Sequence, residues 1–331
     1  MITMPADWKQ HAYCWMAWAF HSEWGENLEN VKCELCRIVS IIAEFEPVRL
    51  LVPHDQIGDA QRQLFGPNVE IVEAPVDDIW MRDIAPTFCL QGRNIVAIDW
   101  NFNSWGATSV RPRRLGDRFG SESAAIFGRT PISARFIAEG GAFVTDGKGT
   151  IITTRSCLLN KNRNPNVSAG QIERGLAELG GRRVIWLEGN PKEPITSGHV
   201  DGYVMFCESG QVLVEDVSGV DRVADKIRMR DIETLRSSMD AQGRPLSLRI
   251  VAPPREKFWA FKSALFAPAY LNAYVANGAV ITGKFGDPER DYLAQLALRH
   301  AFPGREVRMI DINHIAAGGG GVRCLTQPVP L

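Results

Sequence analysis

Short apolar runs, each bounded by turn-forming residues, recur along the 331-residue chain. Runs of this length are typical of buried strands. They begin roughly 50–65 residues apart, and five units at such a period favour a repeat architecture over a plain α/β sheet, in which strands and helices also alternate. The runs lie at 48–53, 95–100, 149–154, 211–215 and 277–283.

Amphipathic helical patterns lie between some of these runs, which indicates an α/β protein. Residues 28–45 have apolar side chains at 28, 31, 35, 38, 39, 42 and 45, the spacing of a helix with one buried face. Residues 169–179 and 287–302 are predicted to form two more helices. The second of these begins with Asp287 as its N-cap and Pro288 in its first turn.

No linker-like or low-complexity stretch divides the sequence, so we expect residues 1–331 to form a single catalytic domain. The loosest region is 104–129, which is polar and rich in glycine and arginine. It is predicted to be a mobile surface loop near the site.

Composition narrows the function classes. The chain has 37 basic and 38 acidic residues and a formal charge of −1, which gives no electrostatic basis for nucleic-acid binding. No window approaches the length of a membrane span, and the N-terminus lacks a signal-peptide pattern. Seven scattered cysteines, an odd number, favour reduced thiols in a cytoplasm. A homo-oligomer is compatible with the sequence but is not indicated by it.

The C-terminal region contains a cysteine preceded by four glycines, in the order Gly318–Gly321, Val322, Arg323 and Cys324. Glycine runs occur where the backbone adopts conformations that a Cβ would forbid, or where another group approaches closely. Val322–Thr326 returns to a strand-like composition. This arrangement favours a nucleophile at a loop–strand junction.

Three other segments carry carboxylates or a histidine in apolar or glycine-rich surroundings. Residues 77–83 hold three aspartates around Trp80, Glu139 precedes two glycines, and residues 197–202 hold His199 and Asp201. On an extended chain His199 and Asp201 would point the same way. The His and Cys residues do not form a spacing that predicts a metal site.

A cysteine with a histidine elsewhere is the minimum for thiol catalysis, although a free cysteine is more often an inert core residue. The surplus of carboxylates favours one target. Acids beside a flat aromatic ring suit a planar cation, which takes bidentate hydrogen bonds at its edge and stacking on its face. A guanidinium has that shape, and cysteine attack on a guanidinium carbon describes a deiminase.

Seven ordered motifs, spanning residues 4–330, resemble agmatine deiminases, the bacterial peptidyl-arginine deiminase-like branch of the guanidino-modifying (pentein) superfamily. The resemblance implies a five-bladed α/β propeller with pseudo-fivefold symmetry. It also implies hydrolysis of a small guanidino compound, without metal or cofactor. The motifs are Met4–Trp8, Asp77–Asp83, Asp99–Gly106, Glu139–Gly141, Leu158–Pro165, Gly198–Asp201 and Gly318–Gln327.

The resemblance implies a role for each matching residue. Cys324 would be the nucleophile that forms a covalent amidino-cysteine intermediate. His199 would protonate the departing ammonia and then activate water. Asp83 and Asp201 would hold the guanidinium nitrogens.

The same resemblance implies a binding set around these residues. Trp80 would form an aromatic wall, with Gly320 in the same substrate-binding set. Glu139 would orient His199 or hold the guanidinium edge.

Arg323 departs from the agmatine deiminase pattern, which has a histidine before the cysteine, and looks more like the arginine deiminase branch. The favoured interpretation places Arg323 in solvent; the alternatives are a pair with a substrate carboxylate or a lowered thiol pKa. Agmatine is the favoured substrate, and arginine or another guanidino compound is the alternative. An amidinotransferase and a non-catalytic binding protein on the same scaffold are the rival functions.

Overall fold

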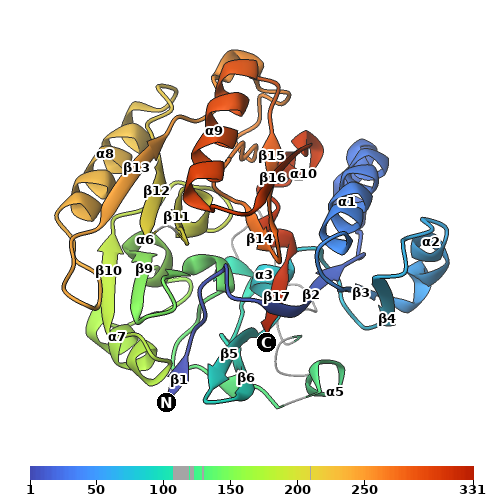
Figure 1. The fold of residues 1–331 in the computed structure, drawn as a ribbon, viewed down its shortest axis with the longest axis horizontal. Helices are drawn as coiled ribbons and strands as arrows, with labels where there is room; N and C mark the ends of the chain where they lie inside the picture. Colours follow the sequence, from blue (N-terminus) through green and yellow to red (C-terminus); the bar gives the residue numbers. More distant parts are fainter. Residues whose placement is uncertain (107–118, 120–122, 129, 209) are drawn as a thin grey trace.

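The computed structural model describes residues 1–106, 119, 123–128, 130–208 and 210–331 (Figure 1). Its strands form five separate sheets, of four, four, three, three and three strands. The sheets lie around the centre of the view in Figure 1, with the longer helices outside them. The chain is therefore α/β.

One sheet joins the two ends of the chain. Its order is β17 (Gln327–Pro330), β2 (His11–Ala17), β3 (Val48–Val52) and β4 (Val69–Glu73). The C-terminal β17 is antiparallel to β2, whereas β2–β3 and β3–β4 are parallel pairs connected through α1 (Leu28–Ala43) and α2 (Ile57–Gln61). The chain is thus closed by pairing its last strand with an early one.

The other four sheets share one pattern, an antiparallel pair followed by a parallel strand. The second sheet also includes β1 (Ile2–Thr3), which is antiparallel to β5. A parallel strand needs a crossover, which a helix supplies in most of these sheets. The strands are β5 (Thr87–Gln91), β6 (Asn94–Asp99) and β7 (Ile132–Ser133); β8 (Val144–Thr145), β9 (Thr150–Thr154) and β10 (Arg183–Leu187); β11 (Val204–Phe206), β12 (Gln211–Glu215) and β13 (Ser247–Val251); and β14 (Tyr274–Ala276), β15 (Ala279–Lys284) and β16 (Glu306–Asp311).

The five predicted apolar runs are confirmed as strands β3, β6, β9, β12 and β15. Each lies in a different sheet and has a neighbour on both sides. An interior strand is covered by other elements, so it is richer in apolar residues than an edge strand. The period read from the sequence therefore reflects one interior strand per sheet.

The three predicted helices are confirmed as α1, α7 (Ala169–Glu178) and α9 (Pro288–Ala301). Asp287 caps α9 by accepting a hydrogen bond from the backbone N–H of Arg290. The sequence analysis missed α8 (Arg222–Arg236), a helix of 15 residues. Its sequence is predominantly polar and only Asp231, Ile232 and Leu235 are buried, so it lacks an apolar run that would mark a helix.

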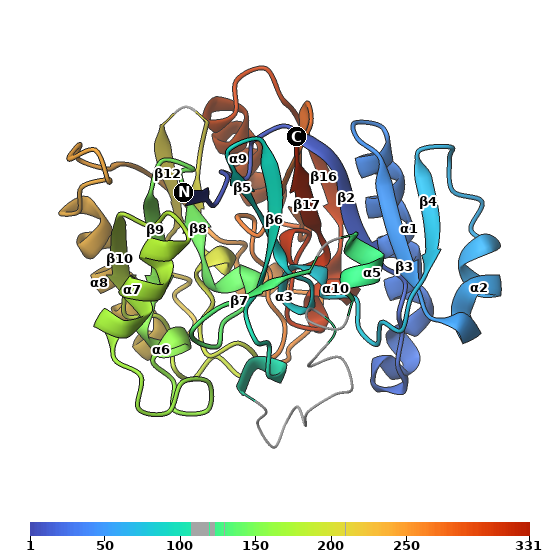
Figure 2. The ribbon, with the colours of Figure 1, turned by 90° about the horizontal axis from the view of Figure 1, so that it is seen from below.

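Shorter elements connect the sheets and carry the site. They are α3 (Met81–Ile84), α6 (Arg155–Leu158), α10 (Asn313–Ala317) and the 3-10 turns η5 (Gly140–Ala142), η6 (Val200–Gly202) and η8 (Arg323–Leu325). In Figure 2, α3 and α10 lie below both chain termini. No helix among the described residues is long and apolar enough to cross a membrane.

The predicted loop at 104–129 lies largely outside the described residues. Two short helices in it are described, η3 (Ser104–Gly106) and α5 (Ala124–Phe127). The side chain of Trp105 in η3 is buried at 4% exposure. The start of this segment is therefore part of the packed structure.

The cap of α9 yields a stability prediction. The buried Asp287 carboxylate accepts hydrogen bonds of 2.8 and 2.6 Å from the Arg255 guanidinium as well as capping the helix. Asp287→Ala should lower the free energy of unfolding by about 2–3 kcal/mol, because it removes a cap and leaves Arg255 with only its exposed partner Glu289. Glu289→Ala, which removes an exposed partner of Arg255, should cost less than about 1 kcal/mol. Urea unfolding measures both, and equal losses would contradict the assignment.

The Asp287 carboxylate also makes the free energy of unfolding depend on pH. Hydrogen bonds from Arg255 lower the pKa of Asp287 from 3.8 to about 2. A lowered pKa in the folded state stabilises the protein above the unfolded pKa, and the effect is lost as the pH falls toward 2. The stability difference between the native protein and Asp287→Ala should therefore shrink on acidification from pH about 5.

Candidate active site

The first part of the site is Asp83 on α3. Its side chain is 4% exposed, and both carboxylate oxygens accept hydrogen bonds. The backbone N–H of Gly141 donates to Oδ1 and the indole N–H of Trp105 donates to Oδ2, each at 2.9 Å. Burial raises the pKa of Asp83, and the charge of His199 opposes this. The carboxylate is thus held by two separate segments, one with Gly141 and one with Trp105.

His199 lies between three carboxylates. Its Nε2 is 3.3 Å from Glu139 Oε2, while its Nδ1 is 3.8 Å from Asp83 and 4.0 Å from Asp201. Burial would lower the pKa of His199, but Asp83 foremost, then Cys157 and Glu139, raise it well above 6.5. The imidazole is therefore protonated at neutral pH.

Glu139 is fully buried beside a permanent cation. Arg163 donates from Nε to Glu139 at 2.8 Å and from its NH2 group to the carbonyl oxygen of Thr196 at 2.6 Å. Burial alone would raise the pKa of Glu139, whereas the Arg163 charge lowers it. Glu139 is therefore ionised and fixed against His199.

His199 and Asp201 do not lie on the extended segment that the sequence predicts. Residues 200–202 form the 3-10 turn η6 and not an extended segment, so alternation on a strand does not bring these side chains together. The turn itself places Asp201 Oδ1 4.0 Å from His199 Nδ1. Their closeness was predicted for the wrong reason.

The favoured interpretation of Arg323 as a solvent-exposed residue is wrong. Arg323 is 5% exposed and donates from NH1 to Asp201 and from Nε to Asp7, each at 2.9 Å. These partners could not be inferred from the pattern around Arg323, since Asp7 is 316 positions away. Arg323 instead fixes the orientation of Asp201.

Cys324 lies on η8, between the glycine segment and β17, where the strand-like composition predicted a strand. Its thiol accepts a hydrogen bond from the amide nitrogen of Asn272 at 3.2 Å. The backbone N–H of Cys324 donates to Asn272 Oδ1 at 3.3 Å. Burial raises the pKa of the Cys324 thiol, and the charges of Asp201 and Asp83 raise it further.

The glycine segment permits a close approach to Trp80. A Cβ on Gly320 would lie 2.5 Å from the Trp80 ring, and one on Gly321 would lie 2.8 Å from Asn272 Oδ1. Gly319 has a φ of +91°, a conformation that favours glycine. These contacts explain why the segment consists of glycines.

A small pocket opens beside Cys324. Trp80, Asp83 and Gly320 lie on its wall together with the thiol. Glu139, His199 and Asp201 are not among its lining residues; His199 lies next to Asp83 and is also close to Glu139 and Asp201. The remaining wall is formed by Trp105, Ile195, Thr196, Gly318 and Gly319.

Comparison with known proteins identifies the family. Residues 3–330 match the model of the Porphyromonas-type peptidyl-arginine deiminases. The chain belongs to this family. It is 33% identical to an agmatine deiminase of Ectopseudomonas mendocina, covering 99% of this chain and 95% of that protein. The structure of an agmatine deiminase of Enterococcus faecalis superposes with a TM-score of 0.90 at 26% identity, covering 99% of this chain and 96% of that one.

Family membership makes the chain a hydrolase that acts on carbon–nitrogen bonds. The resemblance stated from the sequence is confirmed by the family match. The neighbouring solved structures are mixed α/β proteins of the pentein type, in agreement with the sheets described above.

Two residues that contact the site were given no role by sequence reasoning. Asn272 holds Cys324, and Arg163 holds Glu139. Arg163 lies in one of the recognised motifs, which was a usable indication. Asn272 lies in an ordinary apolar stretch, Tyr270–Tyr274, and only the fold brings it to Cys324, 52 positions away.

Glu139, Cys157 and His199 form a compact group whose ligand atoms lie within 4.8 Å of one another. Such a set has donors that suit a metal ion. The Arg163 guanidinium, 2.8 Å from Glu139, already supplies the positive charge at this position. The group therefore serves the ionised Glu139–His199 pair.

The close approach of Gly320 generates a prediction. Gly320→Ala should reduce deiminase activity by about a hundredfold, because the added methyl group must displace Trp80 or the segment carrying Cys324. Gly202→Ala is the control: Gly202 follows Asp201, yet a Cβ there meets nothing within 4 Å. Steady-state ammonia release from both variants tests this, and equal losses would refute the steric explanation.

Proposed function

We propose that this chain hydrolyses agmatine to N-carbamoylputrescine and ammonia through a covalent amidino-cysteine intermediate. The observation that carries the proposal is the pocket in which Cys324 faces Trp80 and the buried Asp83. Relatives named agmatine deiminases, which match over nearly the full chain, support the choice of substrate.

In the proposed reaction, Asp83 and Asp201 bind the guanidinium and the Cys324 thiolate attacks its central carbon. The carbon–nitrogen bond to a terminal nitrogen then breaks, and His199 protonates the departing ammonia. Neutral His199 next takes a proton from water, which attacks the amidino carbon. The carbon–sulfur bond breaks, releasing the urea product and the thiol. Glu139 orients His199 throughout.

The charges of the free site suggest how the thiol is activated. Burial, Asp201 and Asp83 raise the pKa of Cys324, so the resting residue is a neutral thiol. A bound guanidinium would neutralise both carboxylates and lower the thiol pKa. The thiolate therefore forms when the cationic substrate binds, and the thiol proton passes to solvent because His199 is already protonated.

The position of Arg323 bears on the choice between agmatine and arginine. Arginine carries a carboxylate, which needs a cationic or hydrogen-bonding partner. Arg323 is already paired with Asp7 and Asp201 and does not line the pocket. Among the described lining residues Asp83 supplies the only charged carboxylate and no lysine or arginine is present. This charge pattern favours a substrate without a carboxylate.

The wider architecture belongs to the same proposal. We infer that the five sheets are the blades of a five-bladed α/β propeller with pseudo-fivefold symmetry, supported by the strand pattern that four of them share. Residues 1–331 would then be one catalytic domain. The seven free cysteines favour the cytoplasm, and the near-neutral charge favours a small guanidino compound over nucleic acid or a membrane. A homo-oligomer is compatible with this proposal.

A substrate assay tests the function. Purified protein is incubated with agmatine, arginine and a peptidyl-arginine, and both ammonia and the ureido product are measured. Agmatine should be turned over fastest, and Cys324→Ala should abolish turnover while retaining agmatine binding. Addition of an amine acceptor should not divert the product, as it would in an amidinotransferase. Absence of ammonia from every guanidine would disprove the deiminase proposal.

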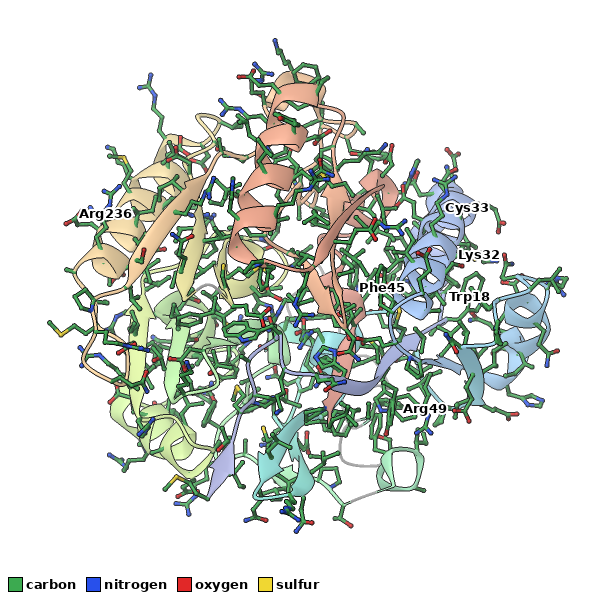
Figure 3. The ribbon with its side chains drawn as sticks, in the orientation of Figure 1. Trp18, Lys32, Cys33, Phe45, Arg49 and Arg236 are labelled. Atoms are coloured by element: carbon green, nitrogen blue, oxygen red, sulfur yellow. The ribbon has the colours of Figure 1, made fainter. Side chains whose placement is uncertain are left out.

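The protonation of Cys324 generates a separate prediction. Asp83→Asn should increase the alkylation rate of Cys324 by iodoacetamide at pH 8 by about tenfold, because a fall of one pKa unit raises the thiolate fraction tenfold. Peptide mass spectrometry follows each thiol, and the exposed Cys33 on α1 (Figure 3) is the internal reference. A rate that stays unchanged relative to Cys33 would show that Asp83 does not suppress the thiolate.

A further inference from the structure

A second cavity lies next to the site and shares no lining residue with the pocket at Cys324. Arg82 and Arg323 line it, and these are the residues directly before Asp83 and Cys324 in the sequence. The segment between β1 and β2, which crosses the centre of the view in Figure 1, forms another wall. The cavity thus lies behind the two short helical turns that carry Asp83 and Cys324.

The two arginines differ in how their charge is balanced. Arg323 is paired with Asp7 and Asp201. Arg82 is 5% exposed, and its Nε donates to the carbonyl oxygen of Arg323 at 3.3 Å. Among the described residues no carboxylate accepts a hydrogen bond from Arg82 or lies within ion-pair distance of it. Its terminal nitrogens are therefore available at the cavity.

A buried guanidinium without a direct anionic partner is costly. Burial lowers the pKa of Arg82 and the neighbouring Arg323 charge lowers it further, whereas the more distant charges of Asp7 and Asp201 act in the opposite direction. Arginine remains charged in proteins, and Asp7 and Asp201 are both engaged by Arg323, so a bound anion would offset the part of this cost that remains. Lys9 also lines the cavity, together with His11, which is paired with Glu46, and Asp7, which is paired with Arg323.

We infer that this cavity binds one small monovalent anion, chloride in the simplest case, on the guanidinium of Arg82. About 40 Å³ of the cavity can hold water-sized groups, which is enough for a single small ion. Pro5, Phe88 and Phe143 supply apolar wall, which favours a weakly hydrated ion. The inference concerns a site separate from the proposed reaction and stands whether or not agmatine is the substrate.

The anion would support the backbone of the site. Arg82 binds the carbonyl group of Arg323, whose peptide bond leads to Cys324. Neutralising Arg82 would thus stabilise the contact between the turn that carries Asp83 and the turn that carries Cys324. Arg82 is a positioning residue in this arrangement, because it touches neither the thiol nor the pocket.

Chloride titration of the purified full-length protein tests the site. Sodium chloride replaces sodium gluconate at constant ionic strength, and the melting temperature is measured. We expect a saturable rise for the native protein. Arg82→Gln should raise the half-saturating chloride concentration by at least about tenfold, because a charge-assisted hydrogen bond is lost. Arg37→Gln, at an exposed position of α1, should leave the titration unchanged.

A crystallographic measurement remains decisive if Arg82→Gln fails to fold. Crystals of the native protein soaked in sodium bromide should show an anomalous peak within hydrogen-bond distance of the Arg82 guanidinium. Loss of that peak when chloride competes would confirm one halide site. Absence of a peak at Arg82, or a melting temperature that does not distinguish chloride from gluconate, would overturn the inference.

Discussion

The ion pairs of Arg323 hold the centre of this molecule together. Its guanidinium lies between Asp7, near the N-terminus, and Asp201, in the turn η6, while Arg323 itself lies near the C-terminus. A buried charge must keep its partners, because removing one leaves the other uncompensated in a low-dielectric interior. The pairing of β17 with β2 brings the two chain ends into reach. The orientation of Asp201 beside His199 therefore depends on closure of the whole chain.

The two short turns α3 and η8 each carry one residue that supports the backbone and one that lies at the pocket. In α3, Arg82 faces the second cavity and Asp83 faces the pocket; in η8, Arg323 and Cys324 divide in the same way. Adjacent residues on a helical turn point in different directions, so a dipeptide can anchor its backbone on one side and present a functional group on the other. An arginine beside the cysteine is consequently part of the support of the site.

Sequence reasoning located what depends on local pattern. The apolar runs identified an interior strand in every sheet because a strand that is buried on both faces contains few polar residues. It missed α8, in which only Asp231, Ile232 and Leu235 are buried. Arg323 was predicted to be exposed and Asn272 was given no role. The physical reason is the same for both: polar side chains are usually exposed, and the partner that keeps one buried cannot be identified from its neighbours in the sequence. Those partners lie 316 and 52 positions away and meet only in the fold.

Binding and activation are coupled through the same carboxylates in the proposed reaction. Asp83 and Asp201 attract a guanidinium, and in its absence their charges join with burial in keeping Cys324 protonated. A neutral ligand in the pocket would leave this repulsion in place, however well it packed against Trp80. Only a cation removes it, so the charge of the substrate contributes to the chemical step as well as to binding. Selectivity for a cation therefore follows from how the nucleophile is generated and needs no further recognition element.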